Sequence, residues 1–126
     1  NLYGMVVDGT YAKMWIADGI FYFINKPIPI LDLPKAKKIV QERFVVQNQV
    51  KYPIFCDLRA VYGADKAARD YLGNQGSLLT KAQAFLVESN YTLFLLNMYL
   101  RTTAVNTTIQ VFKEESKALT FLSQFK

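Results

Sequence analysis

Two short apolar runs, residues 52–57 and 82–87, constrain the fold of this 126-residue chain more than any other feature. Neither run shows the regular polar–apolar alternation of a half-exposed strand, and this is typical of strands covered on both faces near the centre of a parallel sheet. Parallel neighbours need a crossover connection, which is usually a helix. The two runs therefore predict an α/β fold.

The first 25 residues predict a β-meander ahead of these strands. Asp8-Gly9 and Asp18-Gly19 are two-residue hairpin turn signals. The segments around the second turn are rich in aromatic and β-branched residues, which favours a sheet that is buried on at least one face. The predicted strands are residues 2–7, 10–17 and 20–25.

Four main helices are predicted from capping residues and helical spacing. Asp32 caps a first helix that tolerates Pro34 in its first turn and packs through Ile39, Val40 and Phe44. Asp65 caps a second helix that ends around residues 73–76, and Ser89 or Asn90 caps a third that reaches about Thr102. A last strand covers residues 107–112, and Glu114 and Glu115 begin the fourth helix. Together these elements predict one α/β domain over residues 1–126, with a mixed sheet that opens with a hairpin and continues with alternating helices and strands.

The composition excludes several kinds of active site. The chain has no histidine, so the usual metal ligand and the usual general base near neutral pH are both missing. Its only cysteine, Cys56, cannot form an internal disulfide and lies within an apolar run, which indicates a small buried side chain. We therefore predict that the chain is not an enzyme and holds no metal or other cofactor.

The basic charge of the chain does not indicate a nucleic-acid site. The net charge is +5, but the 15 lysines and arginines are spread along the chain. The densest cluster, at Lys35, Lys37 and Lys38, is more typical of a solvated helix face than of a binding patch. The longest apolar stretch, residues 93–100, is far too short to span a bilayer. We expect a cytoplasmic protein without a transmembrane segment, and a start at Asn1 instead of Met indicates that upstream residues were removed or omitted.

The third predicted helix is unusual because apolar residues cover nearly all of its faces, whereas a surface helix keeps a polar side. Its outer face therefore either meets another subunit or an apolar ligand, or is covered by loops. The residues predicted for a self-association face are Phe94, Leu95, Met98 and Tyr99.

Four segments together resemble a bacterial family of uncharacterised STAS-like or SEC14-like domains, similar to the sporulation stage II AA group of anti-sigma-factor antagonists. The segments are residues 14–20 (MWIADGI), 53–59 (PIFCDLR), 66–71 (KAARDY) and 111–119 (VFKEESKAL). The resemblance covers most of the chain and implies an α/β sandwich with a mixed sheet, which agrees with the pattern of elements above.

The resemblance also implies a phosphorylation switch that this chain lacks. In anti-sigma-factor antagonists, a strand ending in Asp is followed by an Asp-Ser pair at the start of a helix, and a partner kinase phosphorylates the serine. Here the strand ends at Asp57 and the helix starts with Asp65 and Lys66. Lysine cannot accept a stable phosphate monoester and carries the opposite charge, so the switch would fail at Lys66.

The segment from Asp57 to Asp70 is the predicted partner-binding surface, because ligands of open α/β sheets gather beyond the carboxyl ends of strands and at helix N-termini. A simpler interpretation is that Asp65 with Arg69, and Lys66 with Asp70, are surface pairs that only support the helix. The predicted partner-binding residues are Asp57, Arg59, Tyr62, Asp65, Lys66 and Arg69.

Two functions of different classes follow from the sequence. The first is a non-enzymatic protein-interaction or regulatory module of the STAS-like type, which binds a protein partner or forms a homodimer. The alternative is a carrier of a lipid or another small apolar ligand, favoured by an aromatic content of 14% and by the apolar third helix.

Overall fold

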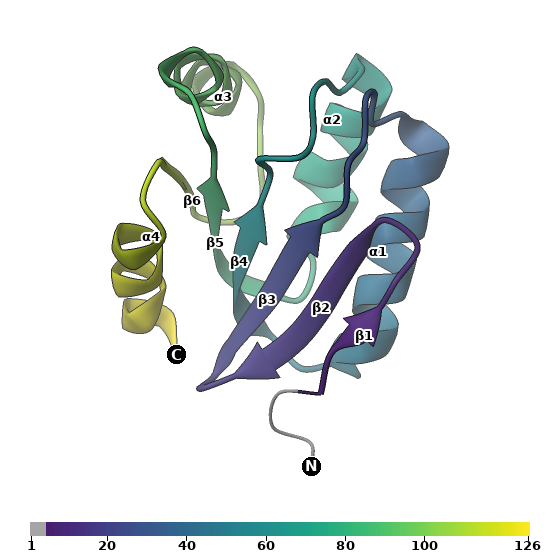
Figure 1. Ribbon diagram of the computed structural model, residues 1–126, viewed down its shortest axis with the longest axis vertical. Coiled ribbons are helices and arrows are strands. Elements are labelled where there is room, and N and C mark those ends of the chain that lie inside the picture. Colours follow the sequence, from purple (N-terminus) through teal and green to yellow (C-terminus); the bar gives the residue numbers. More distant parts are fainter. Residues whose placement is uncertain (1–4) are drawn as a thin grey trace.

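A mixed β-sheet forms the centre of the protein, as the computed structural model shows for the residues it describes, 5–126 (Figure 1). The six strands of this part of the chain lie in sequence order; the first three are antiparallel and β3 to β6 are parallel. This arrangement confirms the predicted mixed α/β sheet. The strands are β1 (Val7–Asp8), β2 (Ala12–Ala17), β3 (Ile20–Asn25), β4 (Tyr52–Asp57), β5 (Thr80–Leu86) and β6 (Ile109–Phe112).

Helices cover both faces of the sheet. Helices α1 and α2 pack on one face and α4 packs on the other, against β4, β5 and β6 (Figure 1). Each face has its own apolar core, with Phe21 and Ile54 on the α1 and α2 side and Phe55 and Leu122 on the α4 side. The helices are α1 (Leu33–Gln47), α2 (Lys66–Asn74), α3 (Asn90–Thr102) and α4 (Glu115–Leu122), with short 3-10 turns η1 (Gln75–Ser77) and η2 (Ser123–Phe125).

The two hairpin predictions had different outcomes. Asp18 and Gly19 form a two-residue turn between paired Ala17 and Ile20, and both have positive φ, at 50° and 76°, as a type I′ turn requires. The predicted two-residue turn at Asp8-Gly9 was wrong, because Asp8 pairs with Lys13 and leaves a four-residue loop. Residues 2–4 of the predicted first strand lie outside the described part of the chain.

The loop between β1 and β2 is longer than predicted because a helix holds it. The backbone N–H and the hydroxyl of Thr10 donate to the carboxylate of Glu42 in α1, at 2.9 and 2.8 Å. The backbone N–H of Gly9 closes the loop on the carbonyl oxygen of Ala12 at 2.9 Å. A Cβ at position 9 would lie 2.9 Å from the backbone carbonyl oxygen of Ala12, which closes the loop, so the loop also depends on glycine here.

Helix α1 begins as predicted but buries a different set of residues. Asp32 accepts a hydrogen bond from the backbone N–H of Lys35, and Pro34 lies in the first turn. Ile39 and Val40 are buried, whereas Phe44 is only half-buried. The end of the helix instead buries Arg43 and Gln47, which are 5% and 1% exposed.

A polar network explains why Arg43 and Gln47 can be buried. The guanidinium of Arg43 donates to Gln47 Oε1 and to the carbonyl oxygens of Gly76 and Leu78, at 2.6, 2.9 and 2.7 Å. Gln47 Nε2 in turn donates to the carbonyl oxygens of Val50 and Leu79. The network therefore ties the end of α1 to the connection between α2 and β5.

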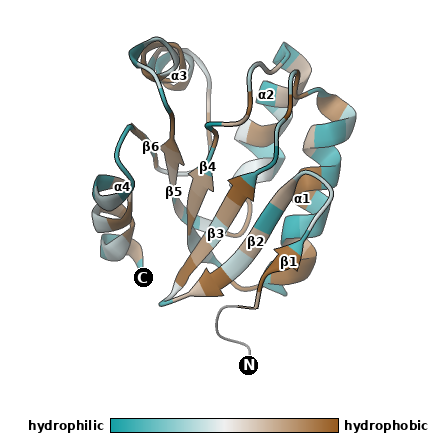
Figure 2. Cartoon of the chain, viewed as in Figure 1, coloured by the Kyte–Doolittle hydropathy of each residue, from teal (hydrophilic) through white to brown (hydrophobic). Residues whose placement is uncertain are grey.

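Helix α3 does not cover either face of the sheet. It lies beyond the carboxyl ends of the parallel strands (Figure 1), and none of its residues is buried, although apolar residues are prominent along it (Figure 2). Ser89 caps it by accepting a hydrogen bond from the backbone N–H of Thr92 at 3.1 Å. Within residues 5–126, no helix has the length and the hydropathy to cross a membrane.

Candidate functional site

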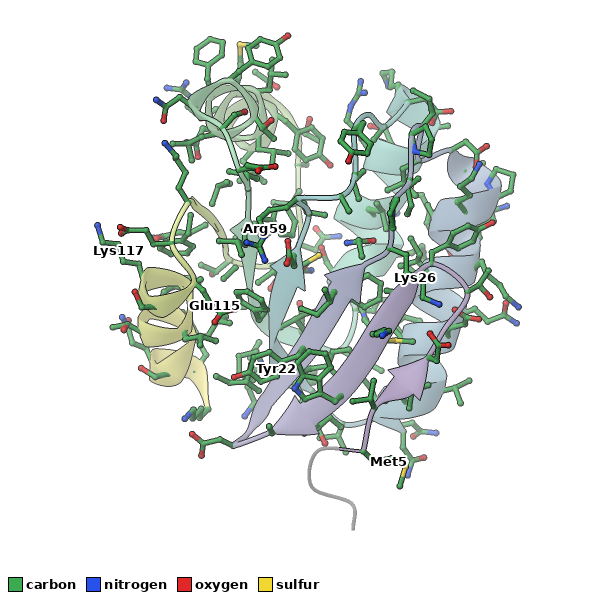
Figure 3. The ribbon with its side chains drawn as sticks, viewed as in Figure 1. Met5, Tyr22, Lys26, Arg59, Glu115 and Lys117 are labelled. Atoms are coloured by element: carbon green, nitrogen blue, oxygen red, sulfur yellow. The ribbon has the colours of Figure 1, made fainter. Side chains whose placement is uncertain are left out.

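The carboxyl end of β4 carries a buried acid paired with an arginine. Asp57 is 6% exposed, and its carboxylate accepts three hydrogen bonds from the guanidinium of Arg59, at 2.8 to 3.2 Å, and one from the backbone N–H of Arg59 at 3.0 Å. These contacts raise the pKa of the Arg59 guanidinium above its usual value. Figure 3 shows Arg59 beyond β4 and Glu115 at the start of α4. Both carboxylate oxygens of Asp57 accept hydrogen bonds from Arg59. This end of β4 therefore presents an ion pair, and Asp57 is not a free carboxylate.

The loop that follows Asp57 is paired with the loop that follows β3. Isolated parallel bridges join Ile28 to Val61 and Leu31 to Ala64. Four backbone hydrogen bonds of 2.8 to 3.0 Å connect residues 28–31 with residues 60–65. The two loops therefore extend the sheet toward α2, and they fix the start of that helix relative to the strands.

The start of α2 uses its polar residues mainly for local structure. Asp65 caps the helix by accepting a hydrogen bond from the backbone N–H of Ala68 at 2.9 Å. Lys66 and Asp70 form the expected i,i+4 pair at 2.7 Å, with 80% of the lysine side chain exposed. Asp65 and Arg69 do not pair; Arg69 instead donates to the carbonyl oxygen of Ala64.

The six residues of the predicted partner surface thus form two separate groups. Asp57 and Arg59 lie at the end of β4, whereas Asp65, Lys66 and Arg69 belong to the start of α2. Tyr62 lies between them in the chain and is 75% exposed. None of the six lines either of the two hollows beside α3 that are described below.

Cys56 precedes this group and has the character of an unreactive thiol. Its side chain is largely buried, and burial raises its pKa to about 12. Because this pKa is raised, the thiol stays protonated near neutral pH. The nucleophilic form of cysteine is the thiolate, so Cys56 is not a nucleophile there. Among residues 5–126, no three His, Cys, Asp or Glu side chains are placed to hold a metal ion.

The outer side of α3 forms an apolar stripe. Tyr91, Phe94, Leu95 and Met98 are 71%, 56%, 38% and 42% exposed, and their spacing of i, i+3, i+4 and i+7 places them on one face. Tyr99, which the sequence placed on this face, points inward, because its hydroxyl donates to the carbonyl oxygen of Arg69 at 2.7 Å. Partial burial raises the pKa of this phenol. We call the four exposed residues the α3 stripe.

Two shallow hollows lie beside α3, along the outer edge of the sheet. The first, of about 630 Å³, lies between α3 and the start of β6, and its lining includes Leu93, Phe94, Arg101 and Ile109. The second, of about 480 Å³, lies between Leu93, the rest of β6 and the start of α4. Sequence reasoning missed both, because nothing local marks β6 as the outermost strand.

Comparison with known proteins identifies a family and a fold. Residues 14–126 match the family described as a domain of unknown function, DUF7793, and the chain belongs to that family. No curated protein matches the chain significantly. Among solved structures, the chain is similar to an uncharacterized protein of the DUF3478 family with a SpoIIAA-like fold, from Shewanella loihica PV-4. The TM-score is 0.62 at 16% identity, over 94% of this chain and 99% of that one. The predicted STAS-like fold is therefore confirmed.

Proposed function

We propose that this member of the DUF7793 family is a non-enzymatic protein-interaction module that binds a partner protein through the α3 stripe. The observation that carries this proposal is a 13-residue helix without a single buried residue, which nevertheless displays Tyr91, Phe94, Leu95 and Met98 on one face. Helices that dock into apolar grooves present anchors at this same spacing.

The size of the stripe supports a binding role. From the exposed fractions, the four side chains leave on the order of 400 Å² of apolar surface in contact with water, which is the size of the largest apolar patch on a typical monomer. Patches of this size are often functional. At about 25 cal/mol per Å², full burial would contribute roughly 10 kcal/mol. Association itself costs about 4–15 kcal/mol, so the stripe needs additional contacts to form a stable complex.

The residue at the start of α2 supports the proposal that the module lacks phosphorylation control. Lys66 stands at the position where the STAS-like resemblance places a phosphorylated serine, and it is exposed and paired with Asp70. We propose that the exposed residues Tyr62 and Lys66 add a weaker contact to the same partner. The carrier of a lipid or apolar ligand stays a prediction, and the open shape of both hollows gives it no added support.

Site-specific photo-crosslinking in the native host tests the proposal. A photoreactive phenylalanine analogue at Tyr91 should crosslink one defined protein, identified by mass spectrometry. The matched control is the same analogue at Val45, which is 77% exposed but lies on α1. The double variant Phe94→Ser/Met98→Ser should abolish the crosslink from position 91 while the protein stays folded. Equal crosslinking from positions 91 and 45, or none from either, would contradict the proposal.

A further inference from the structure

The outer edge of β6 has free backbone hydrogen-bonding groups. The N–H groups of Gln83 and Val87 donate to the carbonyl oxygens of Thr108 and Phe112, at 2.8 and 2.9 Å. Because backbone groups alternate sides along a strand, the N–H and C=O groups of Ile109 and Val111 point away from β5. In the described part of the chain, no strand pairs with this side of β6, and no side chain bonds to these groups.

The opposite edge of the sheet is different. Strand β1 contains only Val7 and Asp8, and the carboxylate of Asp8 forms an ion pair with Lys26 at 2.6 Å. A very short strand with charged side chains is a common protection against edge-to-edge pairing. Strand β6 is twice as long and has no charged residue among its four. The β6 edge is therefore the more open of the two for an added strand.

The two hollows lie where the side chains of an added strand would go. One is next to Ile109 and the other next to Val111 and Phe112, and Leu93 of α3 borders both. In strand addition, backbone hydrogen bonds provide affinity, and pockets for alternate side chains provide specificity. Leu93, Phe94 and Ile109 line the first hollow, so this hollow suits apolar side chains of the added strand.

The charges around this edge select the chemistry of the partner. Arg101 lines the first hollow, while Lys113, Lys117 and Glu114 line the second, so three cations face one anion. Lys117 pairs with Glu114 at 2.9 Å, and Lys113 donates only to the neutral Asn90 side chain. Among the described residues Arg101 has no salt-bridge partner. Acidic residues on the incoming strand would therefore be favoured, whereas a second copy of this basic chain would bring like charges together.

We infer that the β6 edge binds an extended segment of a partner protein, in which apolar residues alternate with acidic ones, as an added strand. This inference rests on the proposed function and deepens it, because Phe94 of the α3 stripe lines the hollow next to Ile109, so a strand on β6 supplies additional contacts at the stripe. The segment's backbone pairs with Ile109 and Val111, its apolar side chains enter the hollows, and its acidic residues face Arg101, Lys113 and Lys117.

Three matched nine-residue peptides test the inference. They share alternating Val and Ile and carry Glu, Lys or Ser at the intervening positions. Fluorescence anisotropy at low salt should show that the Glu peptide binds at least tenfold more tightly than the Lys and Ser peptides. Amide hydrogen exchange, followed by NMR, should slow at least tenfold at Ile109 and Val111 when the Glu peptide is added.

Two substitutions at one position separate backbone pairing from side-chain contact. Val111→Pro removes an N–H that points away from β5, so it leaves the intramolecular ladder intact and should weaken peptide binding at least tenfold at an unchanged thermal midpoint. Val111→Ala keeps the N–H and should weaken binding about threefold or less. The double variant Lys113→Gln/Lys117→Gln should weaken the Glu peptide and leave the Ser peptide unaffected.

The outcomes distinguish this inference from the proposed function. If the Glu peptide does not bind, or binds Val111→Pro as well as the wild type, the inference is overturned, while a partner crosslinked from position 91 would still uphold the proposed function. Equal binding of the Glu and Ser peptides would overturn the acidic specificity. If light scattering shows a dimer and Val111→Pro dissociates it, the β6 edge binds a second copy of the chain and the inference is overturned.

Discussion

The buried guanidinium of Arg43 gives the sharpest test of how this fold is stabilised. Arg43 is 5% exposed, donates three hydrogen bonds and forms no salt bridge with any carboxylate of the described chain. We expect Arg43→Met, which keeps the approximate length of the side chain, to lower the free energy of unfolding. The substitution removes every donor and leaves its acceptors behind.

The magnitude follows from those acceptors. Gly76 retains a hydrogen bond from Gln83 Nε2 at 3.2 Å, so its carbonyl oxygen is not orphaned. Gln47 Oε1 is buried and loses its donor, and the carbonyl oxygen of Leu78 is partly buried. A buried acceptor without a partner costs about 1–3 kcal/mol. Burial of the guanidinium costs desolvation energy, and this cost lowers the pKa of Arg43 to about 10 in the native protein. Removing the guanidinium removes that cost and so offsets part of the loss. We therefore expect a loss of about 2–4 kcal/mol.

Urea unfolding followed by the fluorescence of Trp15 measures this loss. With an m-value of roughly 2 kcal/mol/M, the midpoint should fall by about 1–2 M. The urea midpoint of Arg43→Lys should lie between those of the wild type and Arg43→Met, because an ammonium can reach some but not all of the acceptors. The control is Lys37→Met on the exposed side of the same helix, with an expected change within about 0.5 kcal/mol. A midpoint for Arg43→Met equal to that of the control would refute the reasoning.

Three further predictions concern single positions. Gly19→Ala should cost about 1–2 kcal/mol of stability, because φ is 76°, whereas a Cβ there would make only an ordinary contact with the Lys126 side chain at 3.6 Å. Gly19→Asn should lose less stability in the same thermal melt. Asp65→Ala should cost about 1 kcal/mol and Asp65→Ser much less, since serine can also cap; equal losses would show that the cap contributes nothing. Burial raises the pKa of Cys56 from 9 in the unfolded chain to about 12 in the native protein. The protonated thiol therefore contributes its full stability below about pH 9, and this contribution is lost as the pH rises toward 12, because only the unfolded chain releases the proton readily there. Wild-type stability should fall by about 1 kcal/mol more than that of Cys56→Ala between pH 9 and 10, and a parallel fall would contradict the burial of the thiol.

The candidate site shows where sequence reasoning stops. The Asp65 cap and the Lys66–Asp70 pair were predictable because both involve residues within one helical turn. The pairing of Asp57 with Arg59 was not identified, although the two residues are adjacent in the predicted surface, because a loop conformation decides it. An almost wholly apolar helix gives no pattern that distinguishes its two sides, so the sequence predicts Tyr99 on the outer face, whereas its hydroxyl donates to the carbonyl oxygen of Arg69 in α2.

What the sequence determined by itself is the order and type of the elements. Caps such as Asp32 and Asp65, the Asp18-Gly19 turn and the apolar runs act over a few residues, so their physical effects are present in any fold that contains them. What only the tertiary structure decided is which surfaces remain uncovered. The burial of Arg43, the exposed α3 stripe and the free edge of β6 all depend on contacts between segments far apart in the chain. A helix or strand pattern specifies an apolar face, but only the packing of its distant neighbours determines whether that face is covered.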